Sequence, residues 1–329
     1  MKLIKRIMPA VITIGMLLIV LLLLSILVTP KNNTEEAGFD PDLLAAYGYE
    51  AEPDEVIDVF MLGDSEARTS VSPMKMYHDV GITSYCCGIN DGDLSDVKLM
   101  LRNILKTRSP KLVILECNVL FKEFDWKKML INEASFFFPV ITWHNRWKSL
   151  RADDFMKLPD NTNVQARKGY YYARVVKGAP SYLLKNYMKP DEGCERTGAI
   201  NTCVLEDIAL ILRTKKISML LLSTPSLSNW TMAKHNTCER LASSLNEKAK
   251  GYQTGVEYVD MNLMSDVIEI DWSKDTRDKG DHMNNRGMDK VCTWLGPWLK
   301  DHYDLDDHRT DPACRETWTG MYDEYLKWI

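Results

Sequence analysis

The sequence predicts an α/β fold: a flavodoxin-like three-layer α/β/α domain with a parallel sheet of about five strands, preceded by a transmembrane helix. Short apolar segments alternate with stretches of helical periodicity, which is the pattern of βαβ units. The apolar segments are continuous rather than alternating with polar residues, as expected for strands covered on both faces. The N-terminus carries a long uncharged stretch.

That N-terminal stretch, 7–28, spans a hydrocarbon core of about 30 Å at about 1.5 Å per residue. Lys2, Lys5 and Arg6 precede it, so the positive-inside rule places the N-terminus in the cytoplasm and the remaining chain outside. A cleaved signal peptide is the alternative. However, the stretch exceeds the usual apolar run of about 7–15 residues, and no A-x-A-like site closes it. We therefore expect a single-pass anchor in the cell membrane over 1–30, with an extracytoplasmic domain.

The candidate strands are short and rich in apolar residues; they are 56–62, 82–85, 111–116, 217–222 and 256–259. Candidate helices lie between them and after them, at 95–106, 205–212, 233–250 and in a run that ends at Leu299. Parallel strands joined through helices are expected to have right-handed crossovers.

Four further segments complete the predicted organisation. The polar, acidic segment 31–54 resembles a stalk or linker. The main domain covers 55–300, interrupted by an aromatic-rich, partly helical insertion at about 119–198. Insertions at strand ends of such sheets usually shape the ligand site. The segment 301–329 is expected to be a C-terminal helical extension.

The composition argues against several classes of function. The net charge of −5 and the absence of a basic run interleaved with aromatics argue against a nucleic-acid partner. The 8 cysteines show no zinc-ligand spacing, so we expect no metal and no other cofactor. Their disulfide pairing stays open. Asn32 and Asn229 begin glycosylation sequons, which matter only in a eukaryotic secretory route.

The first chemical signal is Gly63-Asp64-Ser65, directly after the first predicted strand. Functional groups collect at the carboxyl ends of parallel strands, where a serine hydroxyl is exposed and its own N–H can face a bound carbonyl oxygen. The tripeptide alone is more typical of a turn. Its position makes Ser65 a candidate nucleophile.

The second signal lies near the other end of the chain, in the segment from Asp278 to Asn284. A serine nucleophile needs a base within hydrogen-bond reach, and that base needs an orienting carboxylate. His282 has acidic residues just upstream and a helix after it. Alternatively, Asp281 or Asn284 only caps that helix. Asp278 is the preferred orienting acid, because a residue adjacent to the histidine rarely reaches its ring; Asp281 is the alternative.

Together these blocks resemble the SGNH (GDSL-like) hydrolase superfamily over most of residues 55–300. The resemblance implies that Ser65 is the nucleophile and His282 the base. The family spacing is D-x-x-H, whereas Asp278 stands four residues before His282, which implies one extra residue in the loop. It also implies oxyanion donors at the Ser65 and Gly88 N–H groups and at Asn118, although Glu116 and Val119 depart from that family block. Without such roles, Gly88 would form a tight turn and Asn118 a strand-end cap.

The anchor and the insertion resemble SGNH-like proteins that modify bacterial surface polymers, as in lipoteichoic acid D-alanylation and alginate acetylation. That resemblance implies a polytopic membrane O-acyltransferase as partner and acyl donor, and a surface glycan as acceptor. In the insertion, His144, Arg146 and Trp147 are candidate substrate-binding residues, although such an aromatic cluster is more often core.

The prediction is therefore an extracytoplasmic serine O-acyltransferase that forms an acyl-enzyme on Ser65 and acts on a surface polysaccharide or polyol. Two alternatives remain: an esterase of the same fold, and a non-catalytic scaffold that binds a membrane acyltransferase. The acyl group, the acceptor and the oligomeric state cannot be derived from the sequence.

Overall fold

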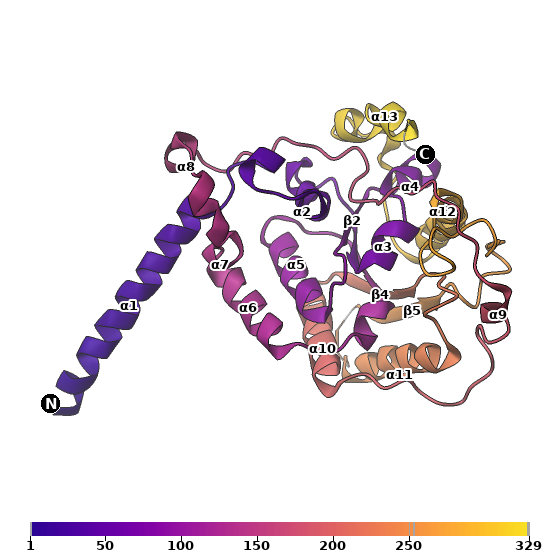
Figure 1. The fold of residues 1–329 in the computed structure, drawn as a ribbon, viewed down its shortest axis with the longest axis horizontal. Helices are drawn as coiled ribbons and strands as arrows, with labels where there is room; N and C mark the ends of the chain where they lie inside the picture. The colour runs from indigo at the N-terminus through magenta and orange to yellow at the C-terminus, as the bar shows by residue number, and fades with distance from the viewer. Residues whose placement is uncertain (1, 250, 253, 328–329) are drawn as a thin grey trace. The chain divides into compact units, whose positions relative to one another are not determined.

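The computed structural model describes residues 2–249, 251–252 and 254–327 (Figure 1). These residues form two compact units. The anchor unit consists of Met1–Asp40 and Asp125–Asn163, and the sheet unit consists of Pro41–Phe124 and Val164–Ile329. Each unit is described by itself below.

The sheet unit is built on a five-stranded sheet with the order β2-β1-β3-β4-β5. All neighbouring strands are parallel. The strands are β1 (Val59–Gly63), β2 (Ser84–Gly88), β3 (Leu112–Glu116), β4 (Ser218–Ser223) and β5 (Val256–Asp260). This is the flavodoxin-like order, and each strand overlaps one of the predicted apolar segments, so the predicted fold class is confirmed.

Helices cover both faces of the sheet. One group packs together as α5 (Leu94–Thr107), α10 (Ala199–Thr214) and α11 (Met232–Lys248); the other comprises α3 (Ser65–Ser70), α4 (Pro73–Val80) and α12 (Asn285–His302) (Figure 1). Because of these two layers, every residue of β1 and β3 is buried, which explains their continuous apolar sequence. Local signals fix the helix starts: Asp93 caps α5 with a capping box, and Ser72 caps α4.

The segment 31–54 differs from the predicted stalk. It contains η1 (Glu35–Ala37) in the anchor unit, and α2 (Pro41–Tyr47) and η2 (Gly48–Ala51) in the sheet unit. Tyr49 is fully buried, and its ring lies 5.4 Å from that of Phe60 in β1. Burial of a large aromatic ring removes much apolar surface from water. This part of the segment therefore joins the core although its neighbours are polar.

The predicted insertion at about 119–198 is divided between the units. Its first part, after η3 (Cys117–Phe121), lies in the anchor unit as α6 (Trp126–Phe137), α7 (Val140–Trp143), η4 (His144–Ser149) and α8 (Ala152–Met156). Its second part, with α9 (Ser181–Leu184), belongs to the sheet unit. There Lys168 pairs at 2.6 Å with Glu52, both fully buried, and its carbonyl accepts a hydrogen bond from Cys86 in β2.

The C-terminal segment is less helical than predicted. It forms η5 (His308–Thr310), η6 (Arg315–Thr319) and the short α13 (Tyr322–Leu326); 328–329 lie outside the described residues. Trp318 is fully buried and the Lys168 ammonium lies 4.8 Å from its ring centre, so single aromatic anchors hold the segment rather than one continuous helix. All 8 cysteines are free thiols.

Helix α1 (Lys2–Val28) contains a segment of 22 residues, Ile7–Val28, that is long and apolar enough to cross a membrane. Within the anchor unit, its C-terminal turn packs against α7, η4 and α8. Val28 is only 3% exposed, and Ser25 is 4% exposed. The end of the apolar helix is therefore part of a folded unit.

Candidate active site

Ser65 is the first residue of α3, immediately after β1 and the capping residue Asp64. The Asp64 carboxylate accepts the Glu66 N–H at 3.1 Å, which fixes the turn from strand to helix. Gly63 makes this turn possible, because a Cβ at that position would lie 2.6 Å from Cβ of Glu116 in β3. The local sequence thus holds the Ser65 hydroxyl at the carboxyl end of the sheet.

Ser65, His282 and Asp278 form a continuous hydrogen-bonded chain. The Ser65 hydroxyl lies 2.8 Å from Nε2 of His282, although the two residues are 217 positions apart in the sequence. Nδ1 of His282 lies 2.5 Å from Oδ2 of Asp278. This order of hydroxyl, imidazole and carboxylate is the arrangement in which a serine loses its proton to a base that an acid orients.

The loop between Asp278 and His282 absorbs the extra residue relative to the D-x-x-H spacing. Lys279 and Gly280 have φ values of 76° and 110°, so the chain turns back on itself. Oδ1 of Asp278 then accepts the His282 N–H at 2.8 Å, and Oδ2 reaches the ring. Burial acts to raise the pKa of Asp278, but hydrogen bonds from His282 outweigh it and lower that pKa. Asp278 is therefore an ionised partner at neutral pH.

Asp281, the alternative acid, lies farther from the imidazole, with 3.4 Å between Oδ2 and Nδ1 of His282. Its other oxygen accepts hydrogen bonds from the Asn229 amide and, at 3.3 Å, from the Ser226 hydroxyl. Burial raises the pKa of Asp281. The shorter distance to the imidazole and the lowered pKa of Asp278 both favour Asp278 as the orienting acid.

Four carboxyl groups crowd the space beside Ser65: Asp64, Glu66, Glu116 and Asp281. Asp64 is fully buried, and Lys122 lies 3.2 Å from its Oδ2. Burial acts to raise the pKa of Asp64, but a hydrogen bond from Glu66 and the charge of Lys122 lower it. Burial, followed by the charge of Asp64, raises the pKa of Glu116 well above its usual value. Lys122 is thus the cation that supports the ionised form of Asp64.

Glu66 is the member of this cluster that contacts the Ser65 hydroxyl. Its Oε2 lies 3.2 Å from the Ser65 hydroxyl and 3.8 Å from Nε2 of His282. Burial, together with the hydrogen bond and charge of Asp64, raises the pKa of Glu66 to about 9. At neutral pH Glu66 is therefore a neutral acid whose proton is engaged with Asp64, so Oε2 stands beside Ser65 as an uncharged acceptor.

The predicted oxyanion donors lie around the same turn. Gly88 ends β2 in register with Gly63, and a Cβ on Gly88 would lie 2.6 Å from the Asp64 carbonyl oxygen, so only glycine allows this approach. The Asn118 amide nitrogen donates to Oδ2 of Asp64 at 3.0 Å and to Oε1 of Glu66 at 2.9 Å. Asn118 thus reaches the site, but its amide N–H groups already donate to two carboxyl groups.

The three candidate substrate-binding residues all belong to the anchor unit. Nη1 of Arg146 donates to the Val28 carbonyl at 2.6 Å, and its Nη2 pairs with Asp154 at 2.8 Å, so Arg146 is committed to packing this unit. Nδ1 of His144 contacts the Ile141 carbonyl at 2.8 Å, and Trp147 is 65% exposed. Substrate binding by these residues stays a prediction.

Two residues of the site were missed in the sequence analysis. Glu66 follows Ser65 directly, but an acidic residue in a first helical turn is common and gave no signal. Asn229 was noted only as a glycosylation sequon, whereas its amide donates to Oε1 of Glu66 at 3.3 Å and to Asp281. Glu66, Asp281 and His282 place potential metal-binding atoms within 4.8 Å of one another, but hydrogen bonds to Ser65 and Asn229 already engage them.

A scan against models of known protein families finds no match, and a search of curated proteins finds no relative. Among solved structures, a candidate platelet activating factor from Streptococcus pneumonia is 12% identical, with a TM-score of 0.40 over 78% of this chain and 88% of that one. A candidate acylhydrolase from Bacteroides fragilis is 12% identical, with a TM-score of 0.38 over 80% and 99%. A GDSL-like lipase from Bacteroides thetaiotaomicron is 12% identical, with a TM-score of 0.36 over 78% and 99%.

The pKa of Glu66 predicts a pH dependence of stability. Because the folded state retains the proton up to about pH 9 and the unfolded chain releases it near its usual pKa, this group's contribution is complete in acid. The contribution is then lost as the pH rises toward 9.

We expect Glu66→Gln to unfold at a higher temperature than the wild type at pH 8, with a smaller difference at pH 4.5. Thermal unfolding in detergent micelles measures both; Glu247→Gln, an exposed glutamate on α11, is the control. Equal unfolding temperatures of wild type and Glu66→Gln at both pH values would contradict the assignment.

Proposed function

We propose that this chain is an extracytoplasmic serine enzyme that transfers acyl groups through an ester on Ser65. The observation that carries the proposal is the chain of hydrogen bonds from the Ser65 hydroxyl through His282 to Asp278. His282 and Asp278 are both far from Ser65 in the sequence, so the fold has to bring the three residues together at the end of β1. Such convergence of a hydroxyl, a base and an acid is typical of nucleophilic catalysis.

The proposed reaction has two balanced steps. First, Oγ of Ser65 attacks the ester carbonyl while Nε2 of His282 takes its proton; the alcohol leaves with that proton, and the acyl group stays on Ser65. Second, an acceptor hydroxyl gives its proton to His282 and attacks the acyl carbon; the bond to Oγ breaks and the proton returns to Ser65. Asp278 keeps Nδ1 protonated and stabilises the transient imidazolium. The N–H groups of Ser65 and Gly88 and the Asn118 amide are the proposed oxyanion donors.

Glu66 fits this mechanism as a neutral acid. An ionised carboxylate 3.2 Å from Oγ would oppose the negative charge that develops during attack. With its pKa raised to about 9, Glu66 is instead uncharged at neutral pH, because it keeps the proton that it donates to Asp64. Burial of the carboxyl cluster therefore keeps Glu66 uncharged, and an uncharged Glu66 does not repel an oxyanion.

The acceptor proposed for the second step is a hydroxyl of a surface polysaccharide or polyol, with water as the hydrolytic alternative. An anchored domain would remain at the membrane, where a polytopic O-acyltransferase could present an acyl donor. A non-catalytic scaffold is the rival function, and the observation in its favour is the Asn118 amide, which donates to Asp64 and Glu66.

Labelling with a fluorophosphonate probe tests the enzyme. We expect the wild type to be labelled at Ser65 and Ser65→Ala not to be. Asp278→Asn should be labelled roughly 10²–10⁴-fold more slowly, since the imidazole loses its orienting charge. Asp281→Asn should be affected far less, because its carboxyl lies farther from the ring. A folded wild type that is not labelled would favour the scaffold. A larger loss of labelling rate in Asp281→Asn than in Asp278→Asn would identify Asp281 as the acid that orients His282.

Ester analysis of surface glycans tests transfer against hydrolysis. In cells lacking this chain, we expect the ester content of a surface glycan to fall, and wild type but not Ser65→Ala to restore it. The restoration depends on Ser65 because the acyl-enzyme is the donor in the second step. An increase in ester content without the chain would instead identify an esterase, and an unchanged content would contradict both.

We also propose that α1 is an uncleaved anchor. Arg146 donates to the Val28 carbonyl, and the Val140 N–H donates to the Ser25 hydroxyl at 3.2 Å. Arg146 and its partner Asp154 are both buried, so removing α1 would expose an ion pair and open the anchor unit. A cleaved signal peptide has no reason to be built into a folded unit in this way.

Exposed apolar side chains of the anchor unit support a membrane location. Outside α1, residues 125–163 expose large apolar side chains that a membrane interface would cover; they are Trp126, Leu130, Ile131, Phe137, Trp147, Phe155, Met156 and Leu158. Two of them, Trp126 and Trp147, are tryptophans, a residue type that is enriched at membrane interfaces. Lys148 lies 5.8 Å from the Trp147 ring centre, a combination suited to lipid headgroups.

Mass analysis of the mature protein tests the anchor. We expect the chain to remain in the membrane fraction after an alkaline wash and to retain residues 7–28, because the end of α1 is buried in the anchor unit. A soluble mature chain that begins after Val28 would show that the segment is a signal peptide.

A further inference from the structure

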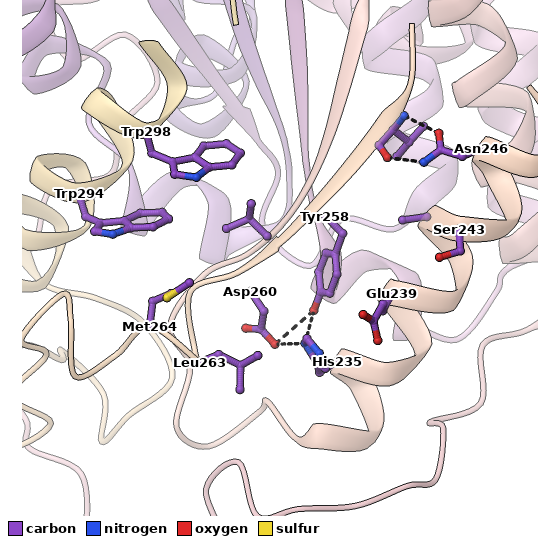
Figure 2. A pocket seen from close by; sticks show the side chains of 13 residues that line it. His235, Glu239, Ser243, Asn246, Tyr258, Asp260, Leu263, Met264, Trp294 and Trp298 are labelled. Atoms are coloured by element: carbon purple, nitrogen blue, oxygen red, sulfur yellow. Dashed lines mark hydrogen bonds and ion pairs between the residues drawn. The ribbon is translucent and has the colours of Figure 1, made fainter. Parts of the chain in front are cut away.

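A second polar and aromatic site lies at the outer edge of the sheet, away from Ser65. A cavity of about 420 Å³ opens along the edge strand β5, between α11 and α12 (Figure 2). We call it the edge pocket; it is lined by residues of α11, β5, the segment after β5, and α12. Its volume lies within the range of about 300–1,000 Å³ that is typical of small-ligand sites.

One wall of the edge pocket is apolar and flat. Trp294 and Trp298 stand one turn apart on α12, with ring centres 6.0 Å apart and planes within 14° of parallel. Figure 2 shows both indoles on the same side of the pocket, with Met264 and Leu263 below them. Leu263 is 49% exposed and Met264 38%, although both are large and apolar. His302 stacks on Trp298 with ring centres 3.9 Å apart and so covers one face of that indole, which leaves Trp294 as the main contact for the flat apolar face of a ligand.

The opposite wall is polar and partly organised. Nδ1 of His235 lies 2.9 Å from Oδ2 of Asp260, and the Tyr258 hydroxyl donates to the same oxygen at 3.2 Å (Figure 2). Glu239 lies on the next turn of α11 and is exposed. Its carboxylate makes no hydrogen bond or ion pair to any residue that the structure describes, and the same holds for the hydroxyl of Ser243. These two groups are available to a ligand.

A neutral sugar ring matches this pair of walls. A pyranose has a face of C–H groups, which carry slight positive charge and stack on the negative face of an indole, and hydroxyls around its rim. Those hydroxyls can donate to Glu239 and exchange hydrogen bonds with His235 and Ser243. The carboxylates of Glu239 and Asp260 oppose an anionic ligand such as a phosphate or uronate, because they outnumber the single imidazole. The chemistry of the pocket therefore favours an uncharged saccharide.

A short polar connection joins the edge pocket to the proposed active site. Asn262 donates its N–H to Oδ1 of Asp260 at 2.9 Å and accepts the Ser226 N–H at 2.8 Å. The Ser226 hydroxyl donates to Asp281, the neighbour of His282. Asp260 ends β5 as Ser65 follows β1, so both sites lie along the carboxyl edge of one sheet.

We propose that the edge pocket binds a neutral sugar residue of the acceptor glycan, while another residue of the same chain presents its hydroxyl at Ser65. This role as an acceptor subsite rests on the proposed acyl transfer; the binding of a neutral saccharide does not. Trp294 provides the stacking surface, supported by Trp298, and Glu239 selects hydroxyl donors.

Calorimetric titration of the full-length protein in detergent micelles tests the proposal. The probes are cellotetraose and the tetrasaccharide of N-acetylglucosamine. We expect at least one to bind saturably, and Trp294→Ala and Glu239→Gln each to weaken its affinity by roughly tenfold or more. Trp126→Ala is the matched control, because that tryptophan is also exposed, at 57%, but lies in the anchor unit. Ser65→Ala should bind as the wild type does.

The outcomes separate the two proposals. Saccharide binding that persists in Ser65→Ala, together with absence of fluorophosphonate labelling, would support the edge pocket while the enzyme proposal fails. No binding by either tetrasaccharide at a Kd of about 1 mM or tighter would overturn the edge pocket whatever the labelling shows. Equal affinities of Trp294→Ala and wild type would also overturn it, and so would binding of tetramethylammonium in place of both sugars, which would identify a cation site.

Discussion

The crowding of carboxyl groups beside Ser65 is the constraint on which the rest of the site depends. Asp64, Glu66, Glu116 and Asp281 lie together with Lys122 as the nearby cation of Asp64. Ionised carboxylates at such separations repel strongly in a buried environment, so the cluster is stable only if some members keep their protons. Asp64 is the member that hydrogen bonds and Lys122 keep ionised, and Glu66 is held neutral.

The same constraint explains the amides around the site. Asn118 and Asn229 both direct an amide nitrogen at Glu66, one from the end of β3 and the other from the loop after β4. Amide donors stabilise crowded oxygens without adding charge, which is why they suit a cluster of mixed protonation. In the proposed reaction the substrate would change this balance, since a carbonyl oxygen that develops negative charge competes for the same donors.

The sequence predicts the elements of this molecule better than their interactions. Continuous apolar segments identify β1, β3 and β4, because strands covered on both faces leave little choice of residue, whereas the edge strand β5 is partly exposed. Ser65 and His282 could be selected because each is placed next to such an element. Glu66 and Asn229 could not, since their roles arise from contacts across 163 positions of sequence. Tyr49 shows the same limit: an acidic neighbourhood predicted a stalk, whereas one ring buried against Phe60 decides the structure.

The anchor unit is discontinuous, and this affects how the chain matures. Its two parts, Met1–Asp40 and Asp125–Asn163, are separated by the stretch that contains β1, β2 and β3. During synthesis those three strands leave the ribosome before the residues that surround the end of α1 exist. The end of α1 therefore stays incompletely packed in the nascent chain until Arg146 emerges and donates to the Val28 carbonyl.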